Sequence, residues 1–109
     1  MKTRTQTKQN LLPLTHPGEL LLLEFLEPAG ISQSRLAQAS GISVSRINDL
    51  IKGRRGITPD TAIRLGAALG ISAEFWLNLQ HDYDMRLARR ERSSEYDSIQ
   101  RMPELQAAA

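Results

Sequence analysis

The stretch that decides the fold is residues 31–53, ISQSRLAQASGISVSRINDLIKG. A serine that can cap a helix and a glycine that can end it predict a first short helix between Ser32 and Gly41. Gly41 has no Cβ, so it can take the left-handed backbone conformation that a sharp turn between helices needs. Ser43 can cap a second helix, whose apolar residues recur at the helical period on one side: Val44, Ile47, Leu50 and Ile51. The spacing therefore predicts a helix-turn-helix.

The opposite side of the second helix is polar, and all of its side chains can form hydrogen bonds: Ser45, Arg46, Asn48, Asp49 and Lys52. A helix that lies in the major groove of DNA presents such a side to the base edges. The alternative is a helical hairpin that only packs in a small bundle. Such a hairpin has no need for a polar face with two cations and no glutamate. The pattern therefore favours double-stranded DNA as a partner.

The distribution of charge supports this interpretation more than its total does. The formal net charge is only +2. Residues 16–30 hold three glutamates and no lysine or arginine, whereas residues 31–64 hold six cations and two aspartates. Basic charge is thus concentrated on the predicted helix-turn-helix, as an electrostatic footprint for phosphate requires.

A chain of 109 residues has room for one domain with a modest core. It contains no cysteine, which excludes disulfides and thiolate metal sites and is compatible with a reducing cytoplasm. The apolar run at 20–23 is far too short to span a bilayer, and no secretory signal is visible. We therefore expect a cytoplasmic protein with no membrane partner.

The residues that enzyme and metal sites need are not grouped in the sequence. His16 and His81 stand alone, with no partner at ligand spacing. Neither a phosphate-cradling glycine loop nor a nucleophile elbow occurs, and Glu24 with Glu27 fits a solvated face better than an acid/base pair. We expect no enzymatic activity, no catalytic residue, no metal and no cofactor.

The remaining helices follow from capping and stop signals. Pro17 starts a helix that we expect to end near Glu27, before Pro28. Thr58 and Ser72 can cap two further helices. The sequence thus predicts an all-α fold of five helices, with an N-terminal arm over 1–14, a domain over 15–92 and a flexible tail over 93–109.

Two of these helices carry more apolar side chains than one core can cover. Leucines surround most of the first helix, so a partner protein or the segment Leu11 to Leu14 could cover the surplus, unless it is simply exposed. The helix after Ser72 holds most of the aromatic side chains. We expect Phe75 in the core, and a contact between two subunits at Trp76, Leu79 and Tyr83.

Three segments together resemble a known family: His16-Pro17-Gly18-Glu19, SVSRINDLIKGRRGITPDTAIRL at 43–65, and FWLNLQ at 75–80 followed by Tyr83 and Asp84. They are similar to the Xre/Cro-like (lambda-repressor-like) DNA-binding domains. Within that group they resemble the HigA-type antitoxins of bacterial toxin–antitoxin modules. The likeness covers about residues 14–90.

This resemblance implies a homodimer that represses its own operon by binding operator DNA. It also implies a partner toxin of the HigB type, a RelE-like mRNA endonuclease that the antitoxin neutralises. The toxin would bind either the tail at 93–109 or the surplus leucines Leu11, Leu12, Leu14 and Leu21. The alternative is a stand-alone Xre-type transcriptional regulator without a toxin partner.

In a dimer, the two second helices would lie about 34 Å apart in successive major grooves. Val44, Ser45 and Asp49 would meet base edges, and Arg46 would read guanine or hold a phosphate. The carboxylate of Asp49 would accept from cytosine or pair with Arg46. Six further residues would position the DNA backbone: Gln33, Ser43, Asn48, Lys52, Arg54 and Arg55.

Overall fold

The computed structural model describes residues 14–108, with side chains through residue 105. This part of the chain is helical and contains no strand. The elements are α2 (Pro17–Leu20), the π-helical η1 (Leu21–Leu26), α3 (Glu27–Ala29), α4 (Gln33–Ser40), α5 (Val44–Ile51), α6 (Pro59–Leu69), α7 (Ala73–Asp97) and α8 (Pro103–Ala108). None of the helices described is both long and apolar enough to cross a membrane. The predicted all-α fold is confirmed.

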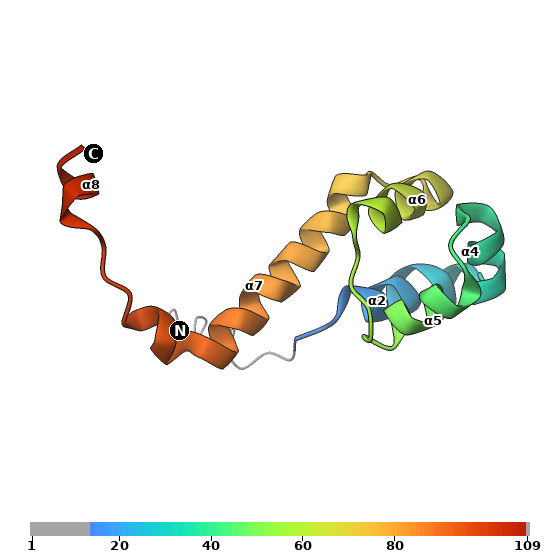
Figure 1. Cartoon of the computed structure of the whole chain (residues 1–109). Coiled ribbons are helices and arrows are strands. Elements are labelled where there is room, and N and C mark those ends of the chain that lie inside the picture. The colour runs from blue at the N-terminus through green and yellow to red at the C-terminus, as the bar shows by residue number, and fades with distance from the viewer. Residues whose placement is uncertain (1–13, 109) are drawn as a thin grey trace, which may run out of the picture.

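The helices from α2 to α6 and the first half of α7 pack together, whereas the rest of α7 extends away from them (Figure 1). Arg92 interrupts α7 with non-helical backbone angles, φ −128° and ψ 27°. Beyond α7, the chain leads to α8 at the far end of the molecule (Figure 1). The sequence did not predict α8, which is the sixth helix within residues 14–108, where five were expected. The predicted boundary between domain and tail, at residue 92, stays a prediction.

The first helix is continuous from Pro17 to Ala29 and passes through Pro28, where we expected it to have ended. Its central six residues form a π-helix, in which the N–H of Glu27 donates to the carbonyl of Leu22, five residues back. A proline ring in a regular α-helix clashes with the carbonyl four residues before it. The wider π turn changes this spacing just before the proline. The helix ends at Gly30, whose φ is +68°.

The predicted helix starts after residue 30 are confirmed, because each capping side chain accepts a hydrogen bond from a backbone N–H three residues on. This bond satisfies a donor that the first turn of a helix leaves without a partner. The capping residues and the donor–acceptor distances are Ser32 (3.0 Å), Ser43 (3.1 Å), Thr58 (3.3 Å) and Ser72 (3.2 Å).

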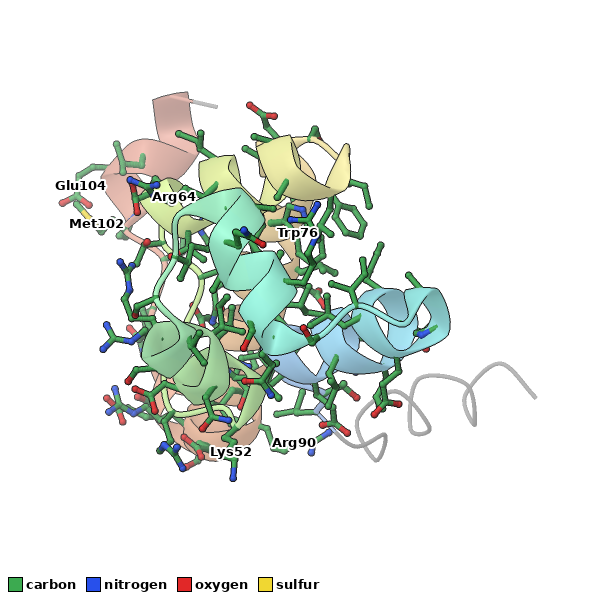
Figure 2. All side chains as sticks on the ribbon, turned by 90° about the vertical axis from the view of Figure 1, so that its right-hand side faces the viewer. Lys52, Arg64, Trp76, Arg90, Met102 and Glu104 are labelled. Atoms are coloured by element: carbon green, nitrogen blue, oxygen red, sulfur yellow. The ribbon has the colours of Figure 1, made fainter. Side chains whose placement is uncertain are left out.

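The hydrophobic core joins the five helices around a fully buried tryptophan. Trp76 packs against Phe25, with ring centroids 5.0 Å apart, and against Phe75 at 5.1 Å. The other buried apolar residues are Leu21, Leu26, Leu36, Ile42, Ile47, Leu50, Ile57, Ala62 and Leu65. Figure 2 shows Trp76 pointing in among the helices.

Three expectations about apolar residues, those for Phe75, Trp76 and Leu21, are wrong. Trp76 is inside its own subunit, so it is not available to a second one, and Phe75 is instead the more exposed of the pair at 37%. Neighbouring helical residues differ by about 100° in direction, so only one of the two can face the core. Leu21 is also fully buried and therefore cannot bind a toxin. The exposed leucine on that helix is Leu23.

Gly18 sets how closely the first helix approaches α5. A Cβ placed on Gly18 would lie 1.7 Å from the carbonyl oxygen of Leu50, so the two backbones touch at this point. Gly18 is buried, and α2 contacts both α5 and α7. This contact holds the end of α5 against the core.

Replacing Gly18 with alanine is therefore expected to destabilise the fold by at least about 3 kcal/mol, since helix backbones must separate to admit the methyl group. Urea unfolding followed by circular dichroism measures this change. Gly30→Ala is the control, because a Cβ there would meet nothing within 4 Å and only the left-handed backbone conformation, φ +68°, opposes it, at a cost of about 1–2 kcal/mol. Equal stability of Gly18→Ala and wild type would contradict the close approach.

Candidate nucleic-acid interface

The turn between α4 and α5 is held by a buried serine. The Ser40 hydroxyl donates to the carbonyl of Leu36 at 2.7 Å and accepts from the N–H of Ile42 at 3.2 Å. Gly41 has φ +76°, the left-handed conformation predicted for it. Arg64 of α6 donates through Nη1 to the Ser40 carbonyl at 3.2 Å. This turn therefore fixes the angle between α4 and α5, and no local pattern indicated the contribution of Ser40 or Arg64.

The outward side of α5 is polar, as predicted. Ile47 and Leu50 are buried, and a step of about 100° per residue places Ser45, Asp49 and Lys52 opposite Ile47. We call these three residues the crest of α5. Ser45 and Lys52 are exposed, and Lys52 points away from the helices (Figure 2). No other helix in the described part of the chain covers the crest, although the side chain of Arg54 bonds to Asp49 there.

The predicted burial of Val44 is wrong. Val44 was expected with Ile47 on the buried side of α5, but 46% of its surface is exposed. Its position at the first residue of the helix explains this, because Ser43 and the preceding turn leave that end open. The exposure is compatible with its other predicted role, a contact with a thymine methyl group.

Arg46 lies on the side of α5 that faces α6. Its Nη2 donates to the hydroxyl of Thr61 at 3.4 Å and lies 4.0 Å from an Asp60 carboxylate oxygen. The same carboxylate pairs with Nε of Arg64 at 3.1 Å. Of the two alternatives for Asp49, the pairing with Arg46 is wrong, because Asp49 pairs with Arg54.

The side of α5 that faces α4 carries a chain of hydrogen bonds. Asn48 Nδ2 donates to Gln33 Oε1 at 3.3 Å, and Asn48 Oδ1 accepts from Arg54 Nη2 at 3.3 Å. Arg54 Nε also donates to Asp49 Oδ1 at 3.1 Å. The sequence singled out these four residues one by one, but it could not show that they form one network. Arg55, by contrast, is exposed and has no partner among the described residues.

A hydrogen bond to Gln80 holds the loop after α5 on α7, and a second bond, within α7, orients the Gln80 side chain. The N–H of Ile57 donates to Gln80 Oε1 at 2.7 Å, and Gln80 Nε2 donates to Asp84 Oδ1 at 2.9 Å. Gln80 is buried. In the sequence it was noted only as part of the FWLNLQ motif, with no predicted role. The loop with its two arginines is therefore fixed by α7 and not only by α5.

His16 connects the first helix, the end of α5 and α7. Its Nδ1 accepts the N–H of Gly18 at 3.0 Å, and its ring meets Tyr83 edge-on at 5.0 Å. A Cβ on Gly53 would lie 3.7 Å from the same ring, which therefore lies beside the turn after α5. Burial lowers the pKa of His16, and the carboxylates of Asp84 and Glu19 offset this only in part. His16 is thus a neutral capping group.

Among the described residues, no cluster of acidic, histidine or cysteine side chains could hold a metal ion.

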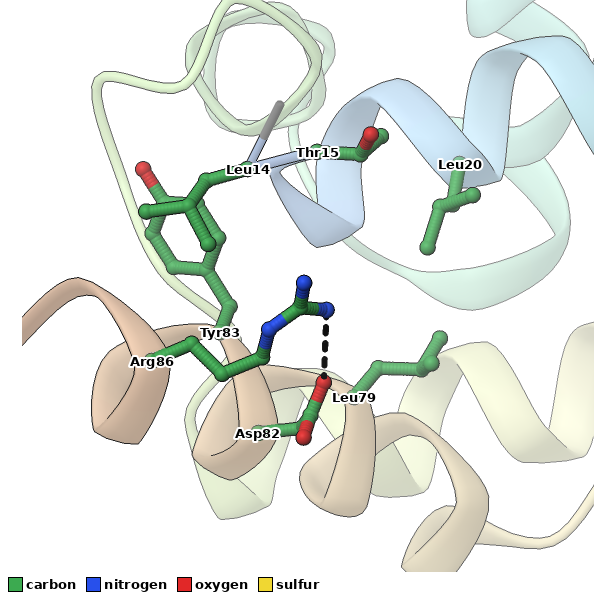
Figure 3. A pocket seen from close by; sticks show the side chains of 7 residues that line it. All are labelled: Leu14, Thr15, Leu20, Leu79, Asp82, Tyr83 and Arg86. Carbon is green, nitrogen blue, oxygen red and sulfur yellow. Dashed lines mark ion pairs between the residues drawn. The ribbon is translucent and has the colours of Figure 1, made fainter. Parts of the chain in front are cut away.

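A groove of about 250 Å³ lies between the first helix and α7 (Figure 3). An ion pair between Asp82 and Arg86, at 3.7 Å, lies at one side of it. The groove brings together residues that were predicted for different partners, Leu14 for the toxin and Leu79 with Tyr83 for the second subunit. Leu11 and Leu12 lie outside the described residues. The groove is also lined by Thr15 and Leu20.

Comparison with known proteins identifies the family. The helix-turn-helix family matches residues 22–76. This chain belongs to the helix-turn-helix family. Virulence-associated protein I of Dichelobacter nodosus is 45% identical over 86 residues, 79% of this chain and 80% of that protein. YbaQ of Escherichia coli K12, an uncharacterized regulator of the helix-turn-helix type, is 35% identical over 72% of this chain and 69% of its own length.

Several proteins of known structure that resemble this chain are antitoxins. The Pseudomonas aeruginosa antitoxin HigA, solved with the higBA promoter, has a TM-score of 0.77 and 38% identity, covering 83% of this chain and 99% of that one. The antitoxin GraA in complex with its operator has a TM-score of 0.76 and 38% identity, covering 84% and 93%. The resemblance to HigA-type antitoxins is confirmed.

The capping bond of His16 predicts a pH dependence of stability. Because the folded state lowers the pKa of His16 below its usual 6.5, the folded protein binds fewer protons than the unfolded chain in the window below that value. The contribution of neutral His16 is complete above about pH 6.5 and is lost as the pH falls toward the lowered value.

The melting temperature of wild type is therefore expected to fall more between about pH 7.5 and 5.5 than that of His16→Asn, since this is about the range in which histidine titrates. Asparagine keeps a capping acceptor and does not titrate, and the other acidic groups are common to both proteins. Thermal melts at several pH values provide the measurement. Parallel pH profiles for the two proteins would contradict the cap.

Proposed function

We propose that this protein is an antitoxin and autorepressor, which binds operator DNA as a homodimer and neutralises a HigB-like mRNA endonuclease toxin. The observation that carries the proposal is the uncovered crest of α5 between two sides that bond to α4 and α6. A helix held rigidly on both sides can present fixed donors and acceptors to a major groove. The antitoxins that resemble this chain, solved with a promoter or operator, support the proposed operator binding.

In this proposal the crest and Val44 face the base edges, and the two α5 helices of a dimer lie about 34 Å apart. Arg46 reaches a base or a phosphate after leaving the weak contact with Asp60. Ser43, Gln33 and Asn48 surround the crest. Lys52, Arg54 and Arg55 supply cations at the end of the helix.

The groove between the first helix and α7 supports the protein contacts of the proposal. Leu79 and Tyr83 are half-buried and form its wall on α7, where we propose that the second subunit binds. Leu14 lies at the same groove, so a toxin that contacts Leu14 would touch the edge of the subunit interface. A stand-alone regulator without a toxin is the second candidate function. The likeness to YbaQ favours it, and a neighbouring toxin gene would decide against it.

The operator-binding function predicts a loss of sequence reading in Arg46→Ala. We expect binding to the gene's own upstream DNA to weaken by roughly 1–3 kcal/mol, with relaxed preference at one base pair in each half-site. Fluorescence anisotropy at several salt concentrations measures it. Arg89→Ala, on the distal half of α7, serves as the control and should leave affinity unchanged. Wild-type binding that is independent of salt and sequence would contradict the function.

The dimer contact predicts a different outcome for two leucines on the same helix. Leu20→Glu places a charge in the groove, whereas Leu23→Glu adds the same charge at an exposed position that does not line it. Only Leu20→Glu is expected to convert the dimer to a monomer in light scattering after size-exclusion chromatography. If Leu20→Glu stays dimeric but no longer co-purifies with the neighbouring gene product, the groove belongs to the toxin and our assignment of the subunit contact is wrong.

A further inference from the structure

The backbone fixes the position of Arg54 at the end of α5. Gly53 has φ +75°, and its N–H donates to the carbonyl of Leu50 at 3.0 Å. The N–H of Arg54 donates to the carbonyl of Asp49 at 2.8 Å. This pair of bonds is the Schellman arrangement, which reverses the chain after a helix. It brings Arg54 back over a crest residue five positions earlier.

The side chain of Arg54 is fixed as well. Its Nε bonds to Asp49 at 3.1 Å and its Nη2 to Asn48 at 3.3 Å, while Asn48 in turn bonds to Gln33 of α4. The guanidinium group is thus oriented by two residues of α5, one of which is tied to the neighbouring helix. More than half of the Arg54 side chain, 59%, remains exposed to solvent. The group is therefore both oriented and accessible.

This arrangement differs from what a contact to phosphate requires. Attraction to phosphate depends on net positive charge, which a carboxylate 3.1 Å away opposes. Reading a base depends on a fixed direction, because arginine recognises guanine through two parallel hydrogen bonds to O6 and N7. Two of the five N–H donors of Arg54 are used within the protein. The remaining three include donors on both terminal nitrogens, as an end-on contact with guanine needs.

We propose that Arg54 reads a guanine in the major groove, and that Asp49 and Asn48 are positioning residues that act through it. The inference rests on the proposed operator binding. It changes two roles expected from the sequence, a backbone contact for Arg54 and a base contact for Asp49. This assignment explains why a carboxylate, that of Asp49, stands on the crest: it would meet the DNA as part of an ion pair with Arg54.

The test is selection of binding sites from a randomised duplex library about 30 base pairs long, enough for two half-sites. Wild type should enrich a symmetric motif with a guanine in each half-site. Arg54→Ala and Arg54→Lys should both lose that guanine and keep the other positions, since lysine cannot make the bidentate contact. In competition binding, the preference for guanine at that position should fall roughly 5- to 150-fold.

The positioning role has its own readout. Asp49→Ala should weaken the preference at the same base pair as Arg54→Ala does, whereas Asp49→Asn, which keeps an acceptor for Nε, should restore part of it. A residue with only a structural role would change stability or overall affinity but not the preference at one base pair. Thermal melts confirm that each variant is folded.

Arg55→Ala is the matched control, because Arg55 is the adjacent cation and has no partner in the described part of the chain. It should lower affinity for every sequence alike and leave the selected motif unchanged. The same uniform loss in Arg54→Ala would show a phosphate contact and overturn the inference while leaving operator binding intact. Wild type that enriches no motif would instead overturn operator binding, and this assignment with it.

Discussion

The contact between the backbones of Gly18 and Leu50 is the constraint on which the rest of this structure depends. It brings the first helix against the end of α5, at a distance that no side chain larger than hydrogen allows. His16 caps the first helix, and its ring lies beside Gly53, so it also supports the turn that follows α5. The crest of α5 is exposed because the opposite side of the helix is held so closely.

Polar contacts complete what this packing begins. Gln80 holds the loop after α5 on α7, and Arg64 holds the turn before α5 on α6. Both bonds involve backbone groups that would otherwise need solvent, and removing a partner from a buried group costs more than a hydrogen bond gains. The helix-turn-helix is therefore stabilised at both ends by contacts with α6 and α7.

The parts of the fold that the sequence predicted are those governed by local rules. Capping serines and the left-handed Gly41 depend on neighbours within a few residues, so their positions could be derived before any packing was known. The predicted positions of Trp76 and Phe75, one at an interface and the other in the core, were the reverse of the observed ones. Which side of a helix faces the core is known only once the helix is packed against its neighbours. The network from Gln33 to Arg54 joins residues up to 21 positions apart, and no local pattern carries that information.

The pairing of charges on the surface around α5 determines how this surface can bind DNA. Arg54 pairs with Asp49, and Asp60 pairs with Arg64 and lies close to Arg46, so much of the positive charge is already compensated within the protein. In the described part of the chain, the cations of this region without an ion pair are Arg35, Lys52 and Arg55. With few unpaired cations, each subunit of the proposed dimer would contribute little electrostatic affinity for DNA. In the proposed dimer, tight binding would then require two subunits on one duplex and correctly placed hydrogen bonds to bases, which would make the interface selective for a symmetric site.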